Sequence, residues 1–178
     1  MARIIALVRG INVGGKNMLP MGELRAACAQ AGMGPMQTYI QSGNLVLDGK
    51  DAATTETALE KLIKQRFGLT VAVIARTADA WTALAAACPF ADEARDEPNH
   101  VMLMVSKAPP AADAPETLTA RARNGERIAR CGEALAIFYP AGAGTSRLSV
   151  SVIDKLVGSP VTARNWNTVL KLIEMAAP

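Results

Sequence analysis

The chain has 178 residues, and at about 100 to 200 residues per domain this length allows one ordinary domain or two small ones and excludes a large multidomain enzyme. Hydrophobic residues make up 50% of the chain, charged residues make up 20%, and the net charge is +3. These values exclude an intrinsically disordered chain. The mild basic excess permits an anionic partner without requiring one.

The first half of the chain shows the element order β-α-β-β-α-β. The continuous apolar run at residues 4–8 predicts a central strand covered on both faces. Pro20 opens a helix that Gly32 ends. A hairpin turns at residues 42–44, and Gly68 ends a second helix. The expected strands cover residues 4–8, 36–42, 45–47 and 69–75, and the expected helical stripes cover 20–31 and 59–67.

The second half repeats this order. Helices are expected at residues 78–87, from 113 onward and at 146–157, with strands at 100–106, 127–131, 134–139 and 161–163. We expect the acidic stretch 92–98 to be an exposed connector. Asn165 caps a last helix, which should bury one face. That face carries Trp166, Val169, Leu170 and Ile173.

This order predicts an α+β fold of two tandem ferredoxin-like (β-α-β-β-α-β) subdomains plus a C-terminal helix. The first subdomain covers residues 1–77. The second covers residues 78–178 and includes a connecting helix and the C-terminal helix. Within each sheet we expect the strand order 4-1-3-2 with antiparallel neighbours.

The cysteines and the apolar segments predict a cytoplasmic protein. Cys28, Cys88 and Cys131 are widely spaced and form no C-x-x-C pair, so neither a disulfide framework nor a zinc site is indicated. The apolar run at residues 4–8 is too short for a signal sequence, and no stretch approaches the ~20 apolar residues of a membrane span. We expect no cofactor, no metal and no membrane partner. Nothing in the sequence indicates an oligomeric state.

The segment after the first strand, Gly10 to Lys16, reads G-I-N-V-G-G-K and fits part of a phosphate-binding loop. Asn17 stands where a magnesium-binding Ser or Thr is required, and Pro20 delays the helix that should start at the lysine. Two interpretations stay open. Backbone N–H groups form an anion-binding concavity together with Arg9 and Lys16, or the glycines only permit a tight loop with positive φ.

The expected strand order brings this loop beside the hairpin turn, because the end of the first strand and the start of the third share one edge of the sheet. The predicted ligand-binding residues are Arg9, Asn12, Lys16, Asn17, Gln41, Ser42 and Asn44, with Arg164, Asn165 and Asn167 as further candidates. The last three join the patch only if the second subdomain docks its final helix there. The set offers cations and neutral donors but no evident general base, so we predict anion binding and name no catalytic residue.

Three stretches of the chain together resemble one known family. They are residues 7–17, 38–44 and 162–168, which read LVRGINVGGKN, TYIQSGN and TARNWNT. The helix opening at residues 20–25 and the strand end at 139–140 match as well. The chain resembles the bacterial domain-of-unknown-function family numbered 1697. This resemblance implies a cytoplasmic α+β protein with two similar subdomains, and it supplies no activity and no catalytic residue.

Three functions are compatible with the sequence. The favoured one is a binding module for a phosphate-bearing small molecule or nucleic acid, although the paired aromatic residues of an RNA-recognition module are missing. The second is an enzyme acting on a small anionic substrate, with Arg9, Lys16 and Arg164 as charge clamps. The third is a structural or interaction subunit without a ligand, whose polar motifs hold the chain together. The only histidine, His100, has no triad or metal-site neighbours in the sequence.

Overall fold

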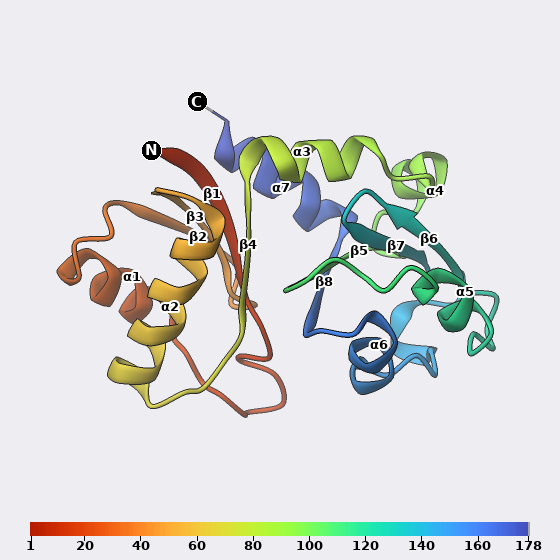
Figure 1. The fold of residues 1–178 in the computed structure, drawn as a ribbon, viewed down its shortest axis with the longest axis horizontal. Coiled ribbons are helices and arrows are strands. Elements are labelled where there is room, and N and C mark those ends of the chain that lie inside the picture. Colours follow the sequence, from red (N-terminus) through yellow and green to blue (C-terminus); the bar gives the residue numbers. More distant parts are fainter. Residues whose placement is uncertain (178) are drawn as a thin grey trace. The chain divides into compact units, whose positions relative to one another are not determined.

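β1 (Ala2–Val8) is an inner strand of the first sheet in the computed structural model, which describes residues 1–177 (Figure 1). Its residues 4–8 are all buried, as the continuous apolar run predicts. β1 pairs antiparallel with β3 (Asn44–Gly49) and with β4 (Val73–Thr77). β2 (Met36–Tyr39) pairs with the outer side of β3, so the order β2-β3-β1-β4 is the predicted 4-1-3-2 order.

Two helices cover one face of this sheet. α1 (Met21–Gln30) follows Pro20, as predicted. α2 (Ala52–Phe67) begins after Asp51, whose side chain accepts a hydrogen bond from Thr54 N at 2.7 Å. Figure 1 shows both helices on the same side of the sheet, where their apolar faces and those of β1, β3 and β4 form one aliphatic core.

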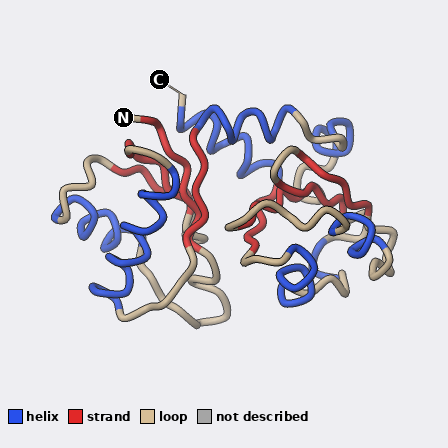
Figure 2. The backbone as a smooth tube through the Cα atoms, in the orientation of Figure 1, coloured by secondary structure: helices blue, strands red, loops and turns tan. Residues whose placement is uncertain are grey.

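The second sheet repeats the arrangement of the first, with the antiparallel order β6-β7-β5-β8. Its strands are β5 (Val101–Ser106), β6 (Arg127–Cys131), β7 (Ala134–Phe138) and β8 (Val161–Asn165). α5 (Ala114–Thr119) and α6 (Val150–Val157) pack against one face of this sheet (Figure 2). The described residues therefore form a mixed α and β structure with two four-stranded antiparallel sheets.

The helix expected from residue 146 begins later than predicted. α6 starts at Val150 because the side chain of Ser149 caps it by accepting a hydrogen bond from Val152 N at 3.4 Å. A single turn of 3-10 helix, η1 (Ala143–Thr145), precedes it.

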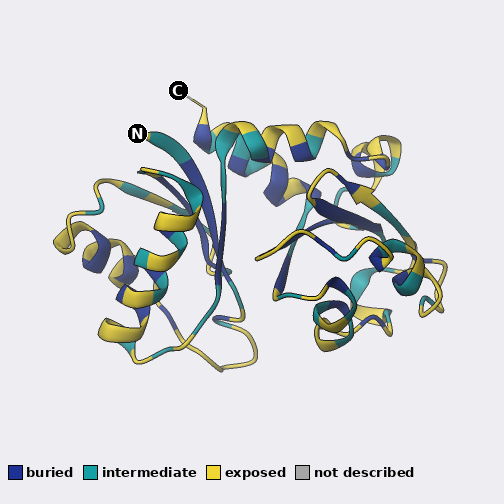
Figure 3. Ribbon diagram, viewed as in Figure 1, coloured by how far each residue is buried: buried dark blue, intermediate teal, exposed yellow. Residues whose placement is uncertain are grey.

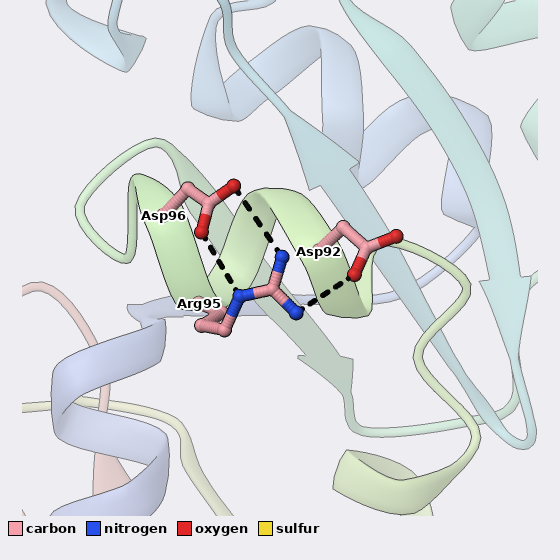
Figure 4. A network of polar contacts seen from close by, with 3 residues as sticks. All are labelled: Asp92, Arg95 and Asp96. Carbon is pink, nitrogen blue, oxygen red and sulfur yellow. Dashed lines mark hydrogen bonds and ion pairs between the residues drawn. The ribbon is translucent and has the colours of Figure 1, made fainter.

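The acidic stretch at residues 92–98 is mostly exposed, as expected, but most of it forms the short helix α4 (Ala91–Asp96) and is not an irregular connector. The guanidinium of Arg95 lies 3.0 Å from Asp92 and 3.0 Å from Asp96 (Figure 4). These three side chains are exposed. Such exposed ion pairs contribute little to stability.

Two helices each follow the last strand of a sheet without a loop: α3 (Ala78–Ala86) follows β4, and α7 (Trp166–Ala176) follows β8. The chain divides into two compact units. The first contains Met1–Trp81 and the residues from Leu172 onward, and the second contains Thr82–Lys171. The division falls within α3 and within α7.

The buried face of α7 differs from the predicted one at a single position. Trp166 and Val169 are buried, as predicted, and Ile173 is half-buried. Leu170 is 52% exposed, and Leu172 is fully buried in its place. The reason is geometric, because a stripe through residues 166, 169, 172 and 176 turns residue 170 outward. No helix within residues 1–177 is long and apolar enough to cross a membrane.

Candidate functional site

Residues 9–20, here called the β1–α1 loop, run from the end of β1 to the start of α1 and are mostly exposed (Figure 3). Gly14 and Gly15 have φ of +56° and +73°, and Lys16 N donates to Val13 O at 3.0 Å. Two successive residues with positive φ, placed between the acceptor and the donor of such a hydrogen bond, are typical of a tight type I′ hairpin turn. α1 begins only at Met21, so the glycines form a projecting hairpin and not the strand-to-helix loop of a P-loop protein.

Two asparagine side chains fix the shape of the β1–α1 loop. Asn12 Nδ2 donates to Leu19 O at 2.9 Å, and Asn12 Oδ1 accepts from Leu19 N at 2.8 Å. Asn17 Nδ2 donates to Gly10 O at 2.9 Å. Both asparagines have positive φ, of 54° and 49°, which Asn adopts more readily than most residues. Their predicted place in the loop is therefore explained by local folding.

The β1–α1 loop contacts the β2–β3 turn (residues 40–43), as the strand order requires. Asn12 Nδ2 also donates to Gln41 O at 2.7 Å, and Val8 N donates to Gly43 O at 2.8 Å. Gly43 has φ of +79°, and a Cβ atom there would lie 2.9 Å from Val8 O and 2.9 Å from Ile11 Cδ1. The close approach of the two segments therefore depends on glycine at position 43.

The remaining predicted residues of this turn also bond locally. Asn44 is buried, and its Nδ2 donates to Tyr39 O at 3.0 Å and to Ser42 Oγ at 2.9 Å. Ser42 is half-buried, whereas the side chain of Gln41 is exposed. Asn44 thus closes the turn from the β3 side, in the same way that Asn12 holds it from the loop side.

Two cations accompany these amides. Arg9 directly follows β1 and is half-buried, and its N–H donates to Ala72 O at 2.9 Å. Lys16 is exposed at the hairpin turn. Residues 9–20 and 40–44 contain no Asp, Glu or His. The surface of the two segments is therefore positive, and it holds no general base.

Exposed apolar side chains lie in the same two segments, and sequence reasoning missed them. Val13, Met18 and Ile40 are each more than half exposed. Ile40 also has φ of +50°, a strained conformation for a β-branched residue. The exposure of Ile40 was overlooked because the predicted strand extended to residue 42. An alternating pattern does not show where a strand ends.

The other predicted residues belong to the second unit, at the junction of β8 and α7. Arg164 Nη1 donates to Thr162 Oγ1 at 2.8 Å and to Ala163 O at 2.7 Å. Burial lowers the pKa of Arg164 to about 10, so it keeps its charge at neutral pH. Asn165 Oδ1 accepts from Thr168 N at 3.0 Å, which confirms its predicted role as the helix N-cap.

Asn167, which capping does not explain, has a partner in the chain. Asn165 Nδ2 and Asn167 Nδ2 both donate to Asn99 Oδ1 at 3.0 Å. Trp166 N donates to Pro98 O at 2.9 Å. The start of α7 is therefore tied to the residues just before β5.

Arg76 is the counterpart of Arg164 in the first unit and was not among the predicted residues. Arg76 Nη1 donates to Ala75 O at 2.7 Å, as Arg164 Nη1 does to Ala163 O. The two arginines occupy the same position of β4 and β8, opposite the inner strand of each sheet. The repeated V-x-A-R at residues 73–76 and 161–164 was the available sequence signal.

Within residues 1–177, no group of three or more His, Cys, Asp or Glu side chains could hold a metal ion. His100 Nδ1 lies 3.0 Å from Glu97 Oε2 in a surface pair. The residues described above therefore offer binding by charge and by hydrogen bonds.

Three comparisons with known proteins place the chain. The solved structure of conserved bacterial protein SP0830 from Streptococcus pneumoniae is similar, with a TM-score of 0.72, 20% sequence identity and coverage of 99% of each chain, and it shows a shared fold alone. No curated protein matches the sequence. The model of the family described as protein of unknown function (DUF1697) matches residues 1–135, which contain the β1–α1 loop and the β2–β3 turn. This match covers most of the chain, which therefore belongs to the DUF1697 family of proteins of unknown function.

Proposed function

We propose that the β1–α1 loop and the β2–β3 turn together bind the phosphate group of a nucleotide or oligonucleotide. The observation that carries this proposal is Lys16, an exposed cation on a hairpin turn held by internal hydrogen bonds. Arg9 adds a second cation at the base of the same loop. Neither segment contains a carboxylate, so the charge that the two segments themselves carry is positive and suits a phosphate.

The loop's hydrogen bonds support binding because they fix its shape before a ligand arrives. The side-chain oxygen and nitrogen of Asn12 both bond to the backbone of Leu19, and the nitrogen also donates to Gln41 O. Ordering a flexible loop costs free energy on binding, and a loop that is already ordered avoids most of that cost. We therefore assign Asn12, Asn17 and Asn44 to positioning, and Arg9, Lys16 and Gln41 to direct contact.

The exposed apolar side chains favour a nucleotide over free phosphate. Ile40 precedes Gln41, whose carbonyl bonds to Asn12, and Asn12 precedes Val13. Ile40 and Val13 thus each adjoin one partner of this hydrogen bond, and Val13 also pairs with Lys16. A ligand with a charged phosphate and a flat, weakly polar base matches a surface that combines cations and aliphatic groups.

A binding role fits this surface better than catalysis, because the two segments supply charge but no group that exchanges protons near neutral pH. We also propose that each unit is ferredoxin-like, which is supported by its antiparallel order 4-1-3-2 and by the two helices on one face. Nucleotide binding by this family member is proposed to take place in the cytoplasm.

The proposal is tested by titrating the full chain with three ligands at low salt: inorganic phosphate, ATP, and a fluorescently labelled single-stranded oligonucleotide. Lys16→Ala is expected to weaken nucleotide binding by about tenfold or more, since a hydrogen bond to a charged group contributes about 1.5 to 3 kcal/mol. For the oligonucleotide, the salt dependence of log K should also lose about one unit of slope.

Lys50→Ala is the matched control, because Lys50 is an exposed lysine at the opposite end of β3 from the turn. It removes the same charge and should leave affinity within about twofold. Val13→Ser should weaken ATP and oligonucleotide binding but not phosphate binding. Equal affinities of wild type and Lys16→Ala, or the absence of binding to all three ligands, would overturn the proposal.

A further inference from the structure

Two of the three cysteines meet within the second unit, although they are far apart in the sequence. Cys88 follows the last turn of α3, and Cys131 is the last residue of β6. Each thiol is close enough to the other to shift its pKa. Cys88 keeps 7% of its surface exposed and Cys131 keeps none.

A backbone carbonyl holds the Cys131 sulfur at the end of α3. In a regular helix Leu84 O would accept from the N–H of residue 88. Here Cys88 N turns to Ala85 O at 3.2 Å, and Cys131 Sγ donates to Leu84 O at 2.8 Å. The Cys131 thiol therefore occupies the position beside Leu84 that the Cys88 amide would take, so the two cysteines are neighbours at one helix end.

The hairpin between β6 and β7 is shaped for this approach. Gly132 follows Cys131 with φ of +58°, and a Cβ atom there would lie 3.0 Å from Leu84 Cδ2. Glycine thus lets the end of β6 come close to the last turn of α3. The close approach of Cys131 to the end of α3 follows from this packing.

We propose that Cys88 and Cys131 form a reversible dithiol pair that hydrogen peroxide oxidises to an intramolecular disulfide. In the first step the Cys88 thiolate attacks a peroxide oxygen, the O–O bond breaks, and Cys88 sulfenic acid and water result once the released hydroxide is protonated. In the second step the Cys131 sulfur attacks the sulfenic sulfur, an S–S bond forms, and the Cys131 proton leaves with hydroxide as a second water. The two thiols lose two electrons in all, and the peroxide gains them.

The order of the two steps follows from the surroundings of each thiol. Cys88 retains some access to solvent, and the neighbouring Cys131 side chain and the Phe90 N–H stabilise its thiolate, so they lower its pKa despite its burial. Hydrogen bonding to Cys88 and burial raise the pKa of Cys131. Cys88 is therefore the sulfur that meets the oxidant, and Cys131 is the resolving thiol.

Oxidation also changes the end of α3, because the disulfide removes the only hydrogen that Cys131 can donate. Leu84 O then loses its donor, and the last turn of the helix is left with an unpaired carbonyl. We expect faster amide exchange at residues 85–88 in the oxidised protein. A thiol reductant should reverse this change.

The test uses the full chain carrying Cys28→Ala, which leaves the pair as the only thiols. Treatment with hydrogen peroxide, quenching with N-ethylmaleimide and intact mass measurement should show the loss of two thiols and of about 2 Da per chain, because S–S formation removes two hydrogens. Peptide mapping should locate the bond between Cys88 and Cys131, and dithiothreitol should restore both thiols.

Two variants separate this result from general oxidation. Cys131→Ser keeps a hydroxyl donor for Leu84 O and leaves Cys88 alone, so the product should be a sulfenic acid that dimedone traps. Cys88→Ser in the Cys28-containing chain leaves Cys131 and Cys28, so no disulfide between residues 88 and 131 can form; Cys28, which is fully buried and whose pKa burial raises to about 11, is the buried reference thiol. Cys28 should react at least about tenfold more slowly than Cys88, since its thiolate is scarce.

Three outcomes would overturn the proposal in the folded wild-type protein. They are retention of both thiols under peroxide that modifies exposed cysteines, conversion of Cys88 to sulfinic acid without disulfide, and disulfides only between chains. Peptide mapping of the wild type decides the question even if a variant fails to fold.

Discussion

The loops that follow β1 and β5 differ between the two units. The β1–α1 loop projects as a hairpin and is held from within by Asn12 and Asn17. Residues 107–113, the β5–α5 loop, are rich in Ala and Pro and are held from outside. Ala108 N donates to Ser159 Oγ at 3.1 Å, and Arg130 Nη2 donates to Ala111 O at 2.8 Å.

The last strands of the sheets, by contrast, repeat in detail. Val73 N donates to Glu60 Oε1 at 2.9 Å, and Val161 N donates to Asp154 Oδ1 at 2.9 Å. In each unit an acidic side chain from the second helix covers an N–H group of the edge strand, which protects that edge from pairing with another chain.

The helix starts repeat too. Ala80 N donates to Thr77 Oγ1 at 3.2 Å, as Thr168 N does to Asn165 Oδ1. The lesson of the comparison is that the scaffold is duplicated, whereas the exposed hairpin with Lys16 is particular to the first unit. This is why we place ligand binding there.

The largest expected effect concerns α3 and α7, the helices that follow the last strand of each sheet. Trp81 and Trp166 are buried in α3 and α7, so Trp166→Ala should lower the free energy of unfolding by about 3 to 5 kcal/mol, and Trp81→Ala by a similar amount. Leu170→Ala is the exposed control in α7 and should cost under about 0.5 kcal/mol. Denaturant unfolding measures all three. A cost below about 1 kcal/mol for Trp166→Ala would mean that this side chain is not part of the core.

The second test compares the glycines of the two hairpins. Gly43→Ala places a Cβ atom 2.9 Å from the backbone oxygen of Val8 at positive φ, so we expect a cost of about 3 kcal/mol. Gly132→Ala meets only Leu84 Cδ2 at 3.0 Å, which can rotate away, so its cost should be nearer 1 kcal/mol, about the strain of the backbone conformation alone. Equal costs in denaturant unfolding would show that the contact of the β1–α1 loop with the β2–β3 turn is looser than described.

The third test compares Glu126, a charged side chain that holds a loop of the second unit, with Asn12, a neutral side chain that holds the β1–α1 loop. Glu126, in the second unit, accepts from Asn124 N at 2.7 Å, Arg123 N at 3.0 Å and Ser146 Oγ at 2.5 Å. Burial opposes its ionisation, but these hydrogen bonds outweigh burial and lower the pKa of Glu126. Glu126→Gln should cost about 2 kcal/mol at pH 7, because it weakens bonds to a charged group.

The sign of the pH dependence follows from the lowered pKa. The stabilisation by Glu126 is complete above the ordinary glutamate pKa and is lost as pH falls through the lower pKa of the folded state. The difference between wild type and Glu126→Gln should therefore shrink in acid. The cost of Asn12→Ala should not change over the same pH range, since an amide does not titrate. Parallel acid dependences for the two variants would refute this assignment.

The smallest expected effect concerns the protected edges. Glu60→Ala and Asp154→Ala should each cost about 1 kcal/mol, because each removes one hydrogen bond to an N–H group of an edge strand. Glu60→Gln keeps an acceptor and should recover most of the loss. Light scattering at high protein concentration adds a second measurement, since an uncovered edge favours association. If Glu60→Gln were as destabilising as Glu60→Ala, the charge and not the hydrogen bond would be responsible.

The sequence by itself determined the architecture. Period-2 and period-3.6 apolar patterns, together with Pro20 and Gly68 at helix ends, located the strands and most helices, because these signals depend on neighbouring residues alone. The strand order then followed from topology, and it placed the β1–α1 loop beside the β2–β3 turn. The helix α4 was missed because it has only six residues, four of them charged, and shows no apolar period.

The tertiary structure alone decided what the polar residues do. Whether Asn12 faces a ligand or two carbonyls depends on where Leu19 and Gln41 O lie, and local sequence does not encode that distance. The contact of Cys88 with Cys131 has the same origin, since it arises only when the end of β6 packs against the last turn of α3. Such contacts join residues far apart in the chain, so they follow from packing and leave no periodic signal in the sequence.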